Sequence, residues 1–221
     1  NAHYAAMQSV PPLSLPLDSG QDLAALEFRR VQATGRYDFA EQVALRNQVY
    51  DDQYGLHLLT PLVLDDGRAI LVDRGWIPAE GNGSRADWSA YDEAEEATVS
   101  GILRASRVRA DFSGVTDPPL APGQSGLDSW LFPNIPRLQT QIKQELLPVY
   151  IQLDPIADDS TPPIPYQPPV DLTEGPHQGY AIQWFSFAAM LLIGYPFYVR
   201  RHTAPRAAGL APLPRARSPW P

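Results

Sequence analysis

The feature that most constrains the fold is an apolar run of 22 residues without a formal charge, residues 178–199. As a helix rising about 1.5 Å per residue it would extend about 33 Å, enough to cross a hydrocarbon core of about 30 Å. A buried helix of a soluble protein is the alternative, because the run also contains Gln183 and Ser186. The length of the run, its flanking aromatic residues and the two arginines that follow it favour a transmembrane helix over residues 177–199. The aromatic residues near its two ends are Tyr180, Trp184 and Phe185, and Tyr195, Phe197 and Tyr198.

The distribution of charge predicts the orientation of this helix. The chain carries a net charge of −8, yet residues 200–221 hold five arginines and no acid, so the residues before them carry −8 − 5 = −13. Positively charged flanks stay in the cytoplasm, so residues 200–221 are expected to form a basic cytoplasmic tail, with the acidic body on the outer side. An acidic body repels polyanions, so we expect no nucleic acid as a partner. The apolar run followed by a basic tail predicts membrane lipid as a partner.

Export of this body requires a targeting signal, and residues 1–16 show none. We therefore expect a first transmembrane helix, or a cleaved signal, upstream of Asn1. The use of 16 arginines against one lysine is typical of a GC-rich bacterial genome. The expected location is the bacterial inner membrane, with the body on the periplasmic side.

Local patterns divide the chain into five segments. Residues 1–19 read as a juxtamembrane lead-in, 20–154 as an extramembrane β domain, 155–176 as a proline-rich strap, 177–199 as the transmembrane helix and 200–221 as the tail. The clearest local signal is the hairpin expected over residues 55–78, where two apolar runs flank Asp65-Asp66-Gly67.

Further strands are expected over residues 27–38, 41–50, 97–106 and 148–154, with Gly35 as a candidate bulge. Residues 133–147 are expected to form one short helix capped by Asn134. These elements predict a mainly β fold: a small antiparallel, barrel-like extramembrane domain followed by the transmembrane helix.

The motifs of several enzyme classes are missing from the sequence. The chain has no cysteine, which excludes disulfides, thiolate metal sites and thiol nucleophiles. It contains no GxSxG, HExxH, P-loop or GxGxxG motif, and its four histidines are scattered. We therefore expect a protein that is not an enzyme.

His177 opens the one constellation that suits a cofactor. On a helix beginning there, Tyr180, Ala181, Trp184 and Ala188 share its face. That face offers an imidazole, flat aromatic rings and small residues, which are compatible with haem. The alternative is an interfacial histidine and an aromatic anchor beside a helix-packing seam.

The stretch VDRGWIP, residues 72–78, allows two interpretations. Arg74 and Trp76 are suited to contact an anionic or planar ligand by charge and stacking. The structural alternative is a strand end, with Gly75 allowing a tight turn and Trp76 filling the core.

Three stretches in this order, FRRVQATGRYD, LVDRGWIP and HQGYAIQWFSFA, resemble the Surfeit locus (Shy-type) cytochrome c oxidase assembly family. The resemblance covers most of the chain. It implies two transmembrane helices around a periplasmic or intermembrane-space β domain, and a role in building haem-copper oxidases of the respiratory chain. It further implies that His177 ligates the iron of haem a, with Tyr180, Gln183 and Trp184 as neighbours.

The function expected from this resemblance is that of a membrane-anchored assembly factor, or chaperone, that presents or stabilises haem a for insertion into subunit I of the oxidase. Arg74, Gly75 and Trp76 are then candidates for contact with the oxidase subunit or a related partner. The alternative is a cofactor-free membrane scaffold, or an accessory subunit of a respiratory complex, that packs on a partner through the same helix face.

Overall fold

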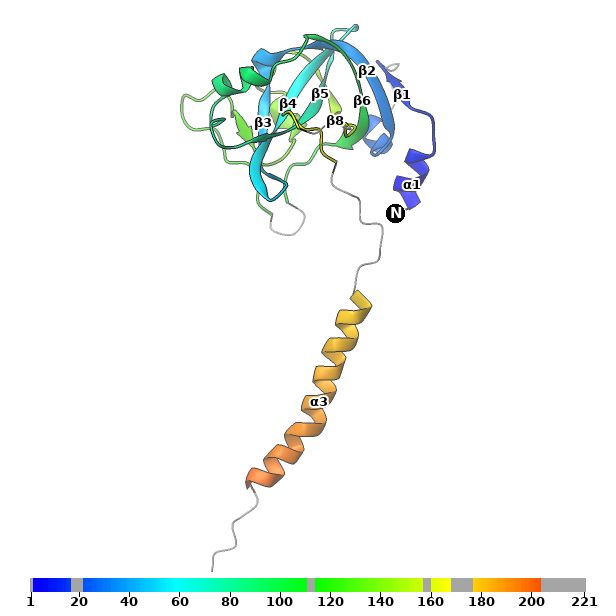
Figure 1. The fold of residues 1–221 in the computed structure, drawn as a ribbon, viewed down its shortest axis with the longest axis vertical. Coiled ribbons are helices and arrows are strands. Elements are labelled where there is room, and N and C mark those ends of the chain that lie inside the picture. The colour runs from blue at the N-terminus through cyan, green and yellow to red at the C-terminus, as the bar shows by residue number, and fades with distance from the viewer. Residues whose placement is uncertain (1, 17–21, 111–113, 157–159, 168–176, 204–221) are drawn as a thin grey trace, which may run out of the picture. The chain divides into compact units, whose positions relative to one another are not determined.

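A computed structural model describes residues 2–16, 22–110, 114–156, 160–167 and 177–203 (Figure 1). For Ala2, His177, Gln178 and Thr203 it describes the backbone alone. The chain forms two compact units, Asn1–Pro169 and Val170–Pro221. The first is a β domain and the second contains a single long helix.

Five strands of the β domain close into a barrel in the order β2, β6, β8, β5 and β4, and β4 pairs back with β2. Neighbouring strands are antiparallel except for β5 and β8, which are parallel. Three further strands extend the sheet: β3 pairs with the first half of β4, β7 lies parallel to β3, and β1 lies parallel to β2. The strands are β1 (Leu13–Leu15), β2 (Arg30–Tyr37), β3 (Val43–Tyr50), β4 (Gln53–Leu64), β5 (Ala69–Pro78), β6 (Glu96–Ala105), β7 (Ser129–Trp130) and β8 (Leu146–Leu153). The predicted mainly β, barrel-like fold is confirmed.

The predicted hairpin is formed by β4 and β5, and Gly67 adopts a φ of +84° in its turn. β5 reads as an almost continuous apolar run because both of its faces are buried. Ile70 and Val72 belong to a core cluster drawn from all five barrel strands, which fills the interior. Ala69 and Leu71 belong to a second cluster outside the barrel.

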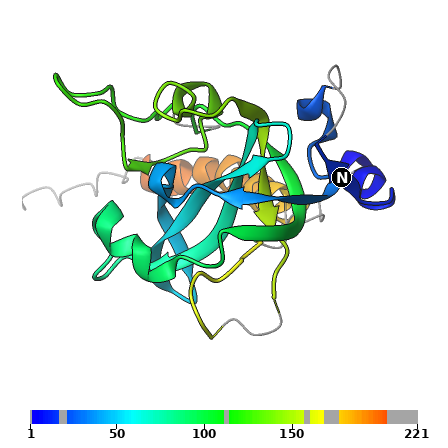
Figure 2. The ribbon, with the colours of Figure 1, turned by 90° about the horizontal axis from the view of Figure 1, so that it is seen from above.

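The connection between β6 and β8 carries the short helix α2 (Ile135–Leu138) and runs along the outside of the barrel (Figure 2). Its side chains contribute to the second cluster. Asn134 caps this helix as predicted, and its side chain accepts a hydrogen bond from the backbone N–H of Arg137 at 3.3 Å. The predicted extent to residue 147 is wrong. The side chain of Gln139 bonds the carbonyl oxygens of Ile142 and Gln144 and accepts from the N–H of Leu146, and these bonds turn the chain directly into β8.

Gly35 does not form the expected bulge, because the pairing of β2 with β6 is regular through this position. A Cβ atom at Gly35 would lie 2.3 Å from the carbonyl oxygen of Val63. Glycine is therefore needed here for the close approach of β2 to β4 that closes the barrel.

The remaining short elements lie in the β domain. They are α1 (Ala2–Gln8) and the 3-10 turns η1 (Leu23–Leu26), η2 (Phe39–Glu41) and η3 (Arg85–Tyr91). Trp88 in η3 is fully buried and donates from Nε1 to the carbonyl of Asn82 at 3.1 Å. Its ring belongs to a buried cluster with Leu58 of β4 and Ile77 of β5, which fixes this turn to the barrel.

The second unit contains α3 (His177–Thr203), a helix of 27 residues. Its segment from Gly179 to His202 contains an 18-residue window with a mean hydropathy of 1.4 and is long and apolar enough to cross a membrane. The helix begins at the predicted residue and continues four residues beyond the predicted end, with Pro196 inside it. Proline near a helix end is tolerated in membrane helices.

Candidate functional site

The face of α3 near its start carries the residues predicted to bind a cofactor. Tyr180 and Trp184 are 59% and 70% exposed, and Trp184 makes an edge contact with Phe187 at 6.0 Å between ring centroids. At about 100° per residue, Tyr180 and Trp184 lie within about 60° of His177 around the helix axis. The helix thus places an imidazole-bearing residue and two exposed aromatic side chains on one side, although the side chain of His177 is not among those described.

Gln183 lies elsewhere on the same helix. Six residues after His177 it is rotated by about 120° from that residue, on a different face from Trp184. The side chain of Gln183 is also exposed. The helix therefore brings Tyr180 and Trp184 together beside His177, but not Gln183.

Arg74 lies at a β-bulge in β5, where the register shifts so that Leu58 pairs with Gly75 and Leu59 with Asp73. Its side chain is only 1% exposed. The guanidinium lies over the rings of Tyr37 and Phe39, at 5.5 and 5.0 Å from their centroids. Burial raises the pKa of Tyr37, so its phenol stays neutral beside this cation.

The hydrogen bonds of Arg74 are internal to the domain. Nη1 donates to Oε1 of Gln42 at 3.1 Å, and Nη2 donates to the carbonyl of Tyr91 and to Oε1 of Glu93. Oε1 of Gln42 also accepts from the hydroxyl of Thr60 at 2.8 Å. Arg74 therefore links β5 to Gln42, which in turn bonds Thr60 of β4, and to the segment from Tyr91 to Glu93.

Gly75 and Trp76 hold a piece of the proline-rich segment against β5. The backbone N–H groups of Trp76 and Ile164 each donate to the carbonyl of the other at 2.8 Å. Gly75 has a φ of +118°, and Trp76 is buried, with its ring 5.6 Å from that of Tyr50. The burial of Trp76 fits the structural interpretation of VDRGWIP, but Gly75 lies inside β5 beside the bulge rather than in a tight turn at a strand end. A partner-binding role of Arg74, Gly75 and Trp76 stays a prediction.

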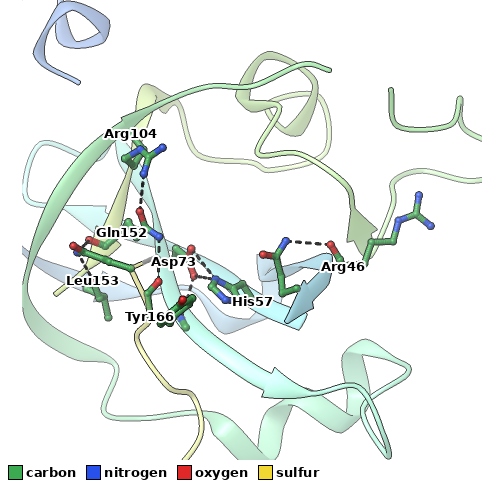
Figure 3. Close-up of polar contacts among 10 residues, drawn as sticks. Arg46, His57, Asp73, Arg104, Gln152, Leu153 and Tyr166 are labelled. Carbon is green, nitrogen blue, oxygen red and sulfur yellow. Dashed lines mark hydrogen bonds and ion pairs between the residues drawn. The ribbon is translucent and has the colours of Figure 1, made fainter. Parts of the chain in front are cut away.

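A polar pair that the sequence analysis did not single out lies next to this bulge. His57 of β4 and Asp73 of β5 are each 5% exposed, and Nδ1 of His57 lies 3.0 Å from both carboxylate oxygens of Asp73 (Figure 3). The backbone N–H of Gly75 donates to Oδ1 of Asp73 at 3.1 Å. Burial alone would lower the pKa of His57, but the charge of Asp73 and the hydrogen bond to it raise that pKa above the ordinary value.

The signal for this pair was present in the hairpin. Counting back from the Asp-Gly turn places residues 57 and 73 on the same face, as diagonal neighbours on adjacent strands. The scattered histidines of the sequence gave no metal-like spacing, so the pairing was missed. Burial and the bulge at Arg74, which the sequence does not show, turn these neighbours into a bonded pair.

The His57–Asp73 pair makes the stability of the domain depend on pH. Because the folded state raises the pKa of His57, it holds the proton more tightly than the unfolded chain. The resulting stabilisation is present in full below about pH 6.5 and is lost as the pH rises through the folded-state pKa. We expect the free energy of unfolding, measured with denaturant on the detergent-solubilised chain, to fall as the pH rises from about 6.5 through the folded-state pKa of His57.

The matched variant for this measurement is Asp73→Asn, which keeps an acceptor for the N–H of Gly75 but removes the charge that favours imidazolium. It should show a flatter pH dependence than the wild-type chain. A wild-type free energy of unfolding that rises with pH relative to the variant would contradict the assignment.

Comparisons with known proteins cover both units. A model of the SURF1 family matches residues 1–189, a range that includes the described β domain and the start of α3. An uncharacterised SURF1-like protein of Mycobacterium tuberculosis (strain ATCC 25618 / H37Rv) is 29% identical over 191 residues, which are 85% of this chain and 67% of the relative.

Two relatives from eukaryotes match shorter stretches. Surfeit locus protein 1 of Takifugu rubripes is 28% identical over 122 residues, covering 48% of this chain and 50% of the relative. A SURF1-like protein of Dictyostelium discoideum is 40% identical over 55 residues, covering 25% of this chain and 20% of the relative.

Proposed function

Since this chain belongs to the SURF1 family, we propose that it is a membrane-anchored assembly factor for haem-copper cytochrome c oxidase, which presents or stabilises haem a for insertion into subunit I. The SURF1 family is known as a family of cytochrome oxidase assembly factors, and it is the family that the sequence resembled. One observation supports the haem step: α3 begins at His177 and exposes Tyr180 and Trp184 on the same side.

The residues on this face suit haem as cargo. A neutral imidazole at His177 would supply an axial ligand to the iron, and the exposed rings of Tyr180 and Trp184 would cover part of the apolar macrocycle. Alanines at positions 181 and 188 leave that side of the helix open to a flat group. Gln183, on a different face, is better placed for a hydrogen bond to a neighbouring protein helix than for a haem contact.

The same proposal assigns the membrane topology. The apolar α3 would cross the bacterial inner membrane, with the β domain in the periplasm and the arginine-rich end in the cytoplasm. Assembly requires binding and release rather than bond chemistry, so we propose that the chain does not act as an enzyme.

An optical spectrum tests the haem step. The full-length protein, co-expressed with the enzymes of haem a synthesis and purified in detergent, should show Soret and α bands. His177→Ala should lose these bands because the axial ligand is removed. The matched control is His202→Ala, which removes a histidine near the other end of α3 and should keep the spectrum.

A second function uses the same helix face without haem. Exposed Tyr180 and Trp184 would equally suit packing on a partner helix in a scaffold or accessory subunit of a respiratory complex. A wild-type protein that carries no haem, or a His177→Ala variant that retains the wild-type spectrum with its circular dichroism unchanged, would argue against haem ligation by His177. The haem-free result would favour the scaffold.

A further inference from the structure

A pocket of about 500 Å³ opens beside the His57–Asp73 pair in the β domain. Its polar wall brings together side chains from β4, β5, β6 and β8: His57, Asp73, Arg104, Tyr150 and Gln152, with Arg107 following β6. The lining also includes apolar and aromatic side chains, among them Phe132 and Tyr166. The volume lies in the range of small-molecule sites, in which apolar surface is combined with a few convergent polar groups.

Arg104 contributes a guanidinium group to this pocket. Its side chain is 22% exposed, and Nη1 donates to Oε1 of Gln152 at 3.0 Å (Figure 3). The orientation of Gln152 is set in turn by a bond from its Nε2 to the carbonyl of Tyr166 at 3.2 Å. Nε of Arg104 forms an ion pair with Oε1 of Glu27 at 3.5 Å but no hydrogen bond among the described residues, and the guanidinium lies 5.1 Å from the centroid of the Phe28 ring.

His57 is oriented for a second contact. In the described part of the chain its hydrogen bonds run through Nδ1 to Asp73, while the ring also lines the pocket. A histidine held at one nitrogen by a carboxylate presents the other nitrogen in a defined direction. When His57 is protonated, its charge offsets that of Asp73, the carboxylate that lines the pocket.

We propose that this pocket binds a small carboxylate with an apolar body, the carboxylate held by Arg104 and Nε2 of His57 and the body lying against Phe132 and Tyr166. Guanidinium and imidazolium donors give charge-assisted hydrogen bonds to a carboxylate, which are stronger than neutral ones. The ring of Phe132 or Tyr166 offers a flat apolar surface for the rest of the ligand. This site is independent of the helix face at His177 and does not rest on haem binding.

Fluorine NMR of para-fluorobenzoate with the full chain in detergent tests the proposal. The neutral amide of the same shape, para-fluorobenzamide, is the ligand control, because it shares the ring and partitions into micelles without the charge. We expect saturable binding of the acid, and Arg104→Gln should weaken it by about tenfold or more through loss of a charge-assisted contact. Arg36→Gln, which removes an exposed arginine paired with Glu95 outside the pocket, should leave the affinity unchanged.

A pH series adds a second readout. The charged and titratable groups that line the pocket with His57 are Asp73, Arg104, Arg107, Tyr150 and Tyr166. Burial raises the pKa of Tyr150 to about 12, so this phenol stays neutral. We expect the affinity for the acid to rise as the pH falls through the pKa of His57, and His57→Asn to remove this dependence.

Three results would overturn the proposal: no saturable binding of the acid, equal binding of the amide, or equal loss in Arg104→Gln and Arg36→Gln. If Arg104→Gln fails to fold, His57→Asn provides the test, because the imidazole is the other group assigned to the carboxylate. A folded His57→Asn variant with the affinity and the pH dependence of the wild-type chain would then count against the site.

Discussion

Replacing Gly75 with alanine is expected to lower the free energy of unfolding of the β domain by about 3 kcal/mol or more. The φ of +118° at Gly75 is strained for any residue with a side chain. A Cβ atom would also lie 2.2 Å from the carbonyl oxygen of Ile164 and 2.5 Å from the nitrogen of Pro165. Both are backbone atoms, so the only relief is to push the segment around Ile164 away from β5 and break its two hydrogen bonds to Trp76.

Denaturant unfolding in detergent, followed by near-ultraviolet circular dichroism of the buried tryptophans, measures this loss. The matched control is Gly67→Ala in the β4–β5 turn, where φ is also positive but nothing lies within 4 Å of the added carbon. That variant should lose only about 1 kcal/mol, from backbone strain alone. Equal losses in the two variants would show that the contact with Ile164 does not restrict position 75.

Replacing Arg74 with alanine should also destabilise the domain by about 3 kcal/mol. The substitution leaves the carbonyl of Tyr91 without this donor and removes the cation that lies over Tyr37 and Phe39. Glu93 is exposed and regains water, and Oε1 of Gln42 keeps its bond from Thr60. The loss should therefore fall at the lower end of the range for a broken buried ion pair.

The unfolding measurement described for Gly75 applies here, with Arg36→Ala as the control. Arg36 and Glu95 form an exposed pair at 3.4 Å, for which we expect a change of less than about 1 kcal/mol. Arg74→Lys keeps the charge but not the planar set of donors, so it should recover only part of the loss. If Arg74→Ala were as stable as Arg36→Ala, the buried network would contribute nothing to the fold.

These two predictions bear on how the RGW stretch is interpreted. Arg74 and Trp76 are occupied by contacts within the domain, and Gly75 gives space to the segment that follows β8. The RGW stretch, which the resemblance suggested for partner contact, thus also stabilises the β domain itself. On α3, Tyr180 and Trp184 are exposed, and Trp184 contacts Phe187 of the same helix. A binding role of this face stays a prediction.

Several elements were predictable because their causes are local. The apolar run of α3, the Asp-Gly turn between β4 and β5, and the cap at Asn134 each depend on residues within a few positions of one another. The far end of α2 was not predictable in this way. Its apolar spacing fits a helix, but the side chain of Gln139 competes for the same backbone groups and ends it.

The sequence by itself determined a barrel-like β domain, an apolar helix and the order of the family-like motifs. Only the tertiary structure decided which polar side chains meet: His57 with Asp73, Arg104 with Gln152, and Arg74 with Gln42, Tyr91 and Glu93. The physical reason is strand register. Side chains alternate between the faces of a strand, so the single extra residue at Arg74, together with barrel closure through Gly35, determines which distant groups share a buried space.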